Sequence, residues 1–293
     1  MTTARSLTLL ALVTTGCHAQ LGTPDPPVSL APDGGTPSDA SAGGGDGDGG
    51  GGADRAAVLT HHNDNQRTGA QLVERTLTPA AVRGRGMQLA MSRPVDAPVQ
   101  AQLLYVPGPT NVIYALTQKA TLYAYDADDR SAFGTEAGLL WKTTLSDPES
   151  AARRYIREAD STPVIDLAAG ELYVLYSTSD TRPEPSGEST VDVAFWIAAL
   201  DLTTGAVKRQ AKIAGEALRP DGTTLSFLAR NHRSRPALLL DHGHLYAGFG
   251  ARPKEGLIEY HGWIARLEAA TLAPRGMICL SPGTAAPGAG AGL

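Results

Sequence analysis

The sequence predicts an all-β fold, a β-propeller of four-stranded blades with about three blades present as an incomplete ring. Short segments of five or six residues are rich in β-branched and aromatic residues, and Gly, Asp, Asn or Pro bounds them, which is typical of strands. Helical periodicity is scarce, and residues 149–159, which come nearest to it, are too polar for a core helix. The strand segments are 112–117, 121–125, 171–176, 195–200, 236–240, 244–249 and 262–267.

The strands recur as an ordered set. A strand that ends in Asp is followed by a Leu-Tyr strand and, after a longer loop, by a strand that ends in an acidic residue. These last acidic residues, Asp126, Asp201 and Glu268, are 75 and 67 residues apart, so long loops such as 178–192 and 250–260 separate the strands. We expect the blades at about 98–145, 161–215 and 234–280.

Two all-β architectures fit short strands of this kind. A β-sandwich explains the strands equally well, but it does not explain why the same order of strands returns. Radial packing of antiparallel meanders buries their apolar faces and leaves only short edges exposed. The repeated order therefore favours the propeller.

The chain begins with an export signal. Residues 1–19 are predicted to be a signal peptide, because Arg5 precedes an apolar run at 7–13 that is too short to span a bilayer. Cys17 follows small residues and resembles the lipidated cysteine of bacterial lipoproteins, although Thr14 departs from the leucine usual there. The alternative is ordinary cleavage, which would discard Cys17. Either way we expect export, as a membrane lipoprotein of the cell envelope or as a periplasmic or secreted protein.

Residues 20–54 are predicted to be a disordered linker, with 11 Gly, 5 Pro, six Asp and no Lys or Arg. The leader and this linker carry the whole formal charge of −5, since the remainder has 24 basic and 24 acidic residues. A neutral body lacks the positive field that nucleic-acid binders need, so nucleic acid is excluded as a partner. With Cys17 lipidated or removed, Cys279 is alone and no intramolecular disulfide can form.

Residues 55–97, the clasp segment, are expected to tie the start of the chain to the propeller. Histidines and an aspartate at 61–64 are types that bind divalent metals, but neighbouring side chains of an extended chain point to opposite faces, so no metal site is predicted. Arg67 can bind a carboxylate through its planar fork. The residues expected to have this structural role are His62, Asn63, Asp64, Asn65, Arg67 and Gly69.

Other candidate site residues also favour structural roles. Asp126, Asp201 and Glu268 recur just before turns, where a carboxylate accepts backbone N–H bonds. Trp263 could stack on a planar cofactor or a sugar, but packing between blades is the favoured role. Four histidines could supply a general base, yet no nucleophile motif accompanies them, so no catalytic residue is predicted. These histidines are His232, His242, His244 and His261.

Parts of the repeat resemble a known family. The strand that ends at Asp126 is followed by Trp141, and the strand that ends at Asp201 is followed by a turn to Gly205. Both are similar to the blades of the pyrroloquinoline-quinone-type, or quinoprotein-like, β-propellers. The string at 62–69 resembles the opening segment of a secreted bacterial subfamily, and the resemblance covers about 58–293.

The resemblance implies a propeller in the cell envelope and little about chemistry. Some members are alcohol or sugar dehydrogenases that stack the quinone over a Trp, hold it with calcium and often carry a vicinal Cys pair, which this sequence lacks. A complete enzyme would need about six to eight blades. Residues 281–293 resemble the loop that leads into a further blade, so we expect a C-terminally truncated fragment, or a chain that a partner completes.

The leading hypothesis is a non-enzymatic, envelope-anchored binding or scaffold module that needs no cofactor. It would contact the membrane through a lipid anchor and offer its propeller face to a protein or a carbohydrate. The alternative is a fragment of a dehydrogenase that depends on pyrroloquinoline quinone and calcium. Fold alone does not decide between them.

Overall fold

The computed structural model describes residues 57–71, 77–131, 137–153, 155–180, 192–251 and 261–283. The predicted signal peptide with Cys17, the linker and the C-terminal residues 284–293 lie outside these ranges. The described elements are almost all strands, and they confirm the predicted all-β fold of propeller type with four-stranded blades. Among the described residues, no helix is long and apolar enough to cross a membrane.

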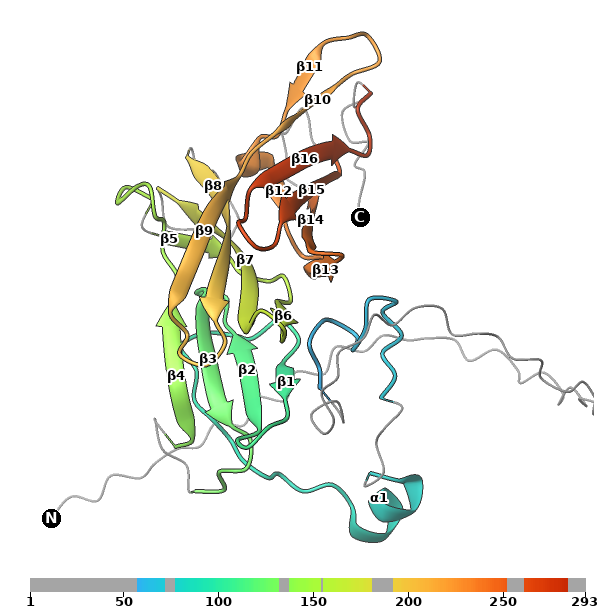
Figure 1. Cartoon of the computed structure of the whole chain (residues 1–293), viewed down its shortest axis with the longest axis vertical. Helices are drawn as coiled ribbons and strands as arrows, with labels where there is room; N and C mark the ends of the chain where they lie inside the picture. The colour runs from blue at the N-terminus through green and yellow to red at the C-terminus, as the bar shows by residue number, and fades with distance from the viewer. Residues whose placement is uncertain are drawn as a thin grey trace, which may run out of the picture. The chain divides into compact units, whose positions relative to one another are not determined.

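The first sheet is an antiparallel meander of four strands (Figure 1). It joins β1 (Leu104–Val106), β2 (Val112–Leu116), β3 (Thr121–Asp126) and β4 (Leu139–Thr144) in sequence order. Its strands are short, and β2 pairs with β3 over the full length of β2, from Val112 opposite Asp126 to Leu116 opposite Leu122. The order of strands is that of a propeller blade.

The second and third sheets repeat this order with the first strand divided in two. In the second sheet, β5 (Tyr155–Glu158) and β6 (Val164–Asp166) both pair with β7 (Glu171–Ser179), which pairs with β8 (Val193–Asp201) and then β9 (Val207–Ile213). In the third sheet, β12 (His232–Arg233) and β13 (Leu239–Asp241) both pair with β14 (His244–Ala251), followed by β15 (Trp263–Glu268) and β16 (Pro274–Cys279).

The remaining elements lie outside the three sheets. A hairpin of β10 (Glu216–Leu218) and β11 (Thr224–Ser226) and a 3-10 turn, η1 (Ala229–Asn231), connect the second sheet to the third. A short helix, α1 (Pro79–Arg85), begins after the N-cap Thr78, whose hydroxyl accepts from the backbone N–H of Ala81. No helix is predicted at these residues from the sequence.

The polar stretch at 149–159 is a turn followed by a strand. Tyr155 and Ile156 of β5 lie opposite Ser179 and Thr178 of β7, so the residues that came nearest to helical periodicity extend the second sheet instead. The cause is tertiary, because β7 offers a free edge beyond β6.

Two apolar clusters hold the sheets together. One lies between the first and second sheets and includes Leu104, Leu122 and Trp196. The other lies between the second and third sheets and includes Phe195, Phe249 and Trp263. The second sheet is therefore covered on both faces, and every residue of β7 is buried. This explains why its strands read as continuous apolar runs, whereas β14 alternates between buried and half-buried residues.

The segment between β5 and β6 contacts the segment between β12 and β13. The hydroxyl of Ser161 donates to the carbonyl of Pro236 at 2.7 Å, and the N–H of Leu238 donates to the carbonyl of Thr162 at 3.0 Å. The upstream half of each divided strand was missed from the sequence. These contacts join the second sheet to the third and place β5 and β12 at one side of a cleft.

Candidate functional site: a charged cleft lined by three sheets

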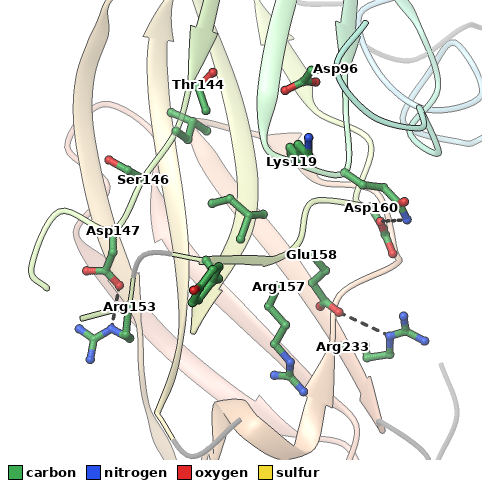
Figure 2. Close-up of a pocket in the computed structure, with 14 residues that line it drawn as sticks. Asp96, Lys119, Thr144, Ser146, Asp147, Arg153, Arg157, Glu158, Asp160 and Arg233 are labelled. Atoms are coloured by element: carbon green, nitrogen blue, oxygen red, sulfur yellow. Dashed lines mark hydrogen bonds and ion pairs between the residues drawn. The ribbon is translucent and has the colours of Figure 1, made fainter. Parts of the chain in front are cut away.

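A cleft of about 600 Å³ lies where residues of all three sheets meet. The first sheet contributes the turn between β2 and β3 and the chain after β4, the second contributes β5 and the residues after it, and the third contributes Arg233 (Figure 2). Leu145 and Ile156 are among its apolar lining residues. Its acidic residues are Asp96, Asp147, Glu158 and Asp160, and its basic residues are Lys119, Arg153, Arg157 and Arg233.

Asp147 is the most heavily hydrogen-bonded carboxylate of the cleft. Its Oδ2 accepts from Arg153 Nε at 2.7 Å, Thr178 Oγ1 at 2.5 Å and Trp196 Nε1 at 3.2 Å. Its Oδ1 accepts from the backbone N–H groups of Glu149 and Ser150, both at 2.9 Å. Burial alone would raise the pKa of Asp147, but these donors hold it below its ordinary value. The carboxylate therefore stays ionised and fixed.

Arg153 extends this arrangement into a cluster of ions. It also donates from NH1 to Asp192 Oδ2 at 2.7 Å, and its NH2 is 3.5 Å from Glu149 Oε2. Its side chain is 10% exposed. The hydrogen bonds that Arg153 donates to Asp147 and Asp192 raise the pKa of its guanidinium, and they tie the loop after β4 to the start of β8.

Glu158 and Arg157 join the second sheet to the third. Glu158 Oε1 accepts from the backbone N–H of Ser234 at 2.8 Å, and Oε2 is 3.4 Å from Arg233 Nε. Arg157, on the same strand, donates to the carbonyls of Ala229 and Arg230 at 3.2 and 2.9 Å. The two side chains thus hold β5 against β12 and η1.

The opposite wall comes from the first sheet and the clasp segment. Asp96 accepts from the hydroxyls of Thr117 and Thr121, each at 2.8 Å. Gln118 Nε2 donates to Asp160 Oδ1 at 3.2 Å, which connects the turn after β2 to the residues after β5. None of the cleft residues was predicted from the sequence, because most of their partners lie tens of residues away and no motif marks them.

Trp141 and Gly205, predicted as structural residues, lie in direct contact. A Cβ built on Gly205 would be 2.3 Å from Cε3 of Trp141, so the backbone of the turn after β8 covers one face of the indole on β4. Thr143 Oγ1 donates to the carbonyl of Gly205 at 2.7 Å. Glycine is required here both for space and for its φ of 71°.

The recurring acids behave alike in two blades and differently in the third. Asp126 accepts from the N–H of Asp128 at 2.9 Å, and Asp201 accepts from the N–H groups of Thr203 and Thr204 at 3.1 and 2.9 Å. The turn-forming role expected of Glu268 was wrong. Its Oε2 instead accepts from Arg275 Nε at 3.1 Å, since the longer side chain reaches past its own turn.

The clasp segment contacts the third sheet through carbonyls. Arg67 NH2 donates to the carbonyl of Leu238 at 3.0 Å, and its NH1 donates to Thr60 Oγ1 at 2.6 Å and to the carbonyl of His61 at 2.7 Å. The carboxylate partner expected for Arg67 was therefore wrong. Asn65 Nδ2 donates to the carbonyl of Leu240 at 2.9 Å.

The chain at 61–69 is a tight turn and not extended. His62, Asn63, Arg67 and Gly69 have φ values of 54°, 72°, 57° and 66°. The rings of His61 and His62 stack with centroids 3.9 Å apart, so the expectation that they point to opposite faces was wrong. Asp64 lies in the same turn and accepts from the backbone N–H of Thr68 at 3.0 Å. Among the described residues there is no group of three His, Cys, Asp or Glu that could hold a metal ion.

The candidate histidines and Trp263 lie away from the cleft lining. Trp263 is fully buried, with its ring centroid 5.8 Å from that of Phe227. His232 is also buried, and burial lowers its pKa to about 4. The side chain of His242 is 84% exposed, with Nδ1 3.0 Å from Asp241 Oδ2.

The described residues do not fit pyrroloquinoline quinone and calcium. None of the three tryptophans lines the cleft, because Trp196 and Trp263 are buried in the core and Gly205 covers Trp141. The carboxylates of the cleft accept hydrogen bonds from the chain's own donors, and no metal-binding group occurs in the described part of the chain. The described part of the cleft therefore offers neither a tryptophan to stack on the quinone nor a group of ligands for calcium.

No protein-family model matches the chain, and no curated protein matches it. Similar solved structures include the quinohemoprotein alcohol dehydrogenase from Comamonas testosteroni, with a TM-score of 0.36 and 16% identity over 78% of this chain and 42% of that one. The quinohemoprotein alcohol dehydrogenase ADHIIG from Pseudomonas putida HK5 has a TM-score of 0.33 and 14% identity over 68% and 36%. BamB from Moraxella catarrhalis has a TM-score of 0.18 and 13% identity over 57% and 60%.

The chain thus spans less than half the length of either alcohol dehydrogenase. Likeness at this level says nothing about activity.

Proposed function

We propose that this chain is a non-enzymatic binding or scaffold module of the bacterial cell envelope. Exported by its signal peptide, it is held at the membrane by lipid on Cys17, and the linker at 20–54 gives it reach. The cleft is the surface it offers to a protein or a carbohydrate ligand.

The proposal is supported by one observation: the chain's own hydrogen-bond donors hold Asp147 and Glu158, two charged groups of the cleft, in place. A general acid or base must exchange a proton with its substrate, but the side chain of Asp147 is 1% exposed, accepts five hydrogen bonds and has a lowered pKa. Glu158 is engaged by Ser234 and Arg233. These groups form a fixed polar surface, which suits binding better than proton transfer.

The test against the dehydrogenase alternative uses the purified chain with added pyrroloquinoline quinone and calcium. We expect no shift in the quinone absorbance and no reduction of an artificial electron-acceptor dye with alcohols or sugars as substrates. A known quinone-dependent alcohol dehydrogenase serves as the positive control. Dye reduction that requires the quinone would overturn the non-enzymatic proposal.

The test of anchoring uses membrane fractionation of cells that produce the full chain. We expect recovery in the membrane fraction, and we expect Cys17→Ala to abolish it because the lipid is lost. Cys279→Ala changes the other cysteine and should leave the protein in the membrane fraction. Membrane recovery of Cys17→Ala would show that lipid on Cys17 is not the anchor.

A further inference from the structure

Asp160 is a buried carboxylate with hydrogen-bonding capacity left over. It is 9% exposed and lines the cleft. Gln118 donates to its Oδ1, while no donor among the described residues reaches Oδ2 and no cation pairs with it. Oδ2 is not among the buried polar atoms that lack a partner, so it is open to the water of the cleft. It can therefore exchange that water for a hydrogen-bond donor brought from outside the chain.

Lys119 supplies a donor beside this acceptor. It follows Gln118 in the turn between β2 and β3, so it lies on the same side of the cleft as Asp160 (Figure 2). Its side chain is exposed, and it makes no ion pair or hydrogen bond with the described residues. The Asp160 carboxylate and the Lys119 ammonium thus both line the cleft, and each can form a further hydrogen bond.

The charge of the cleft selects against simple ions. Among the described residues, four acidic and four basic side chains line it, and their formal charges sum to zero. Asp147 pairs with Arg153, and Glu158 with Arg233. An anion would meet four carboxylates and a cation four basic groups, which leaves little net Coulombic gain for either. A neutral hydroxyl avoids both repulsions, because it can donate to Asp160 and accept from Lys119.

From this geometry we infer that the cleft binds a neutral polyhydroxylated ligand, a short oligosaccharide, through hydroxyls that donate to Asp160 and accept from Lys119. The volume of about 600 Å³ lies within the range of about 300–1,000 Å³ of small-molecule sites. Ile156, which is half-buried, provides apolar surface for the C–H face of a sugar ring. This inference rests on the proposed binding function and names its ligand class.

The experiment uses the full chain and three neutral trisaccharides, maltotriose, cellotriose and chitotriose, with saturation-transfer NMR and titration calorimetry. Inorganic phosphate and spermidine are the charged probes. We expect saturable binding of at least one trisaccharide and weaker binding of both charged probes. Absence of binding for all three trisaccharides, or tighter binding of phosphate or spermidine, would overturn the inference.

Variants locate the binding in the cleft. We expect Lys119→Ala, an exposed position whose change leaves packing intact, to weaken trisaccharide binding at least fivefold, and Asp160→Asn to weaken it about tenfold or more. The matched controls, Lys142→Ala and Asp221→Asn, change exposed residues outside the cleft lining and should bind as the unaltered chain does. Binding that survives Lys119→Ala unchanged would place the sugar elsewhere.

This outcome is separable from the proposed function. If no trisaccharide binds, the quinone assay is still expected to be negative, and the proposal of a non-enzymatic module stands. Quinone-dependent dye reduction, in contrast, would remove the proposed function whether or not a trisaccharide binds.

Discussion

The backbone of Gly205 lies against the indole of Trp141, and this contact joins the turn after β8 of one blade to β4 of the blade before it. Thr143 fixes the same turn from β4 through its hydrogen bond to the carbonyl of Gly205. The contact lies close to the core between the first and second sheets, in which Trp141 is partly buried. A single glycine therefore determines how closely two blades approach.

Replacing Gly205 with alanine should destabilise the protein by about 2–4 kcal/mol. The new Cβ would clash with Trp141 and would also impose a positive φ of 71° on a residue with a side chain. Urea unfolding measures the loss. The control is Gly170→Ala, whose φ is 63° but whose Cβ would meet no atom within 4 Å, so it should lose only about 1 kcal/mol. Equal losses in the two variants would contradict the importance of the indole contact.

Leu272 occupies the equivalent turn of the third sheet with a side chain. Its N–H donates to the carbonyl of Glu268 at 2.8 Å, as the N–H of Gly205 does to Asp201, and its φ is 58°. The side chain is 1% exposed in the core between the second and third sheets.

Leu272→Gly should therefore destabilise by about 1–3 kcal/mol, because the cavity left in the core outweighs the relief of backbone strain. Thermal and urea unfolding measure the difference. An increase in stability would mean that strain, and not packing, dominates at this turn.

Burial of His232 should make stability depend on pH. Because burial lowers its pKa from 6.5 to about 4, the folded protein binds fewer protons than the unfolded chain between these values. Stability is therefore lost as pH falls from about 6.5 to about 4, by about 3 kcal/mol at most for this residue. His232→Phe should flatten the dependence in that window, measured as urea midpoints at several pH values. An unchanged slope would contradict the assignment to His232.

Glu171 contributes at a lower pH. Although burial opposes ionisation, hydrogen bonds from Arg209, Lys208 and Tyr173 lower its pKa from 4.5 to about 2. Lys208 Nζ is 2.8 Å from Oε1, and Tyr173 donates to Oε2 at 2.8 Å. The stabilisation is present above pH 4.5 and is lost as pH falls towards 2.

Glu171→Gln should thus cost about 1–3 kcal/mol near neutral pH and little near pH 2. Paired urea titrations at the two pH values measure this difference. A cost that is the same at both would show that the charge of Glu171 does not matter.

Much of the fold could be predicted from residues close together in sequence. Strands such as β7 and β14 are visible as apolar or alternating runs, and the turn at Asp201 is visible from an acid followed by Thr-Thr-Gly. These signals depend on local conformation and on side-chain period, which a single sequence carries. The upstream half-strands β5 and β12 were missed, because they are polar and exist only where the long partners β7 and β14 offer an edge.

The sequence by itself was enough to predict the all-β class, the recurring order of strands in each blade and a structural role for Gly205. The tertiary structure alone decided which side chains meet. It brings Lys119, Asp160 and Arg233 to one cleft from three sheets, turns the Arg67 fork to carbonyls in place of a carboxylate, and covers Trp141 with Gly205. The physical reason is that hydrogen bonds and ion pairs act over a few ångströms in space, whereas these partners lie tens of residues apart in the chain, where no periodicity records them.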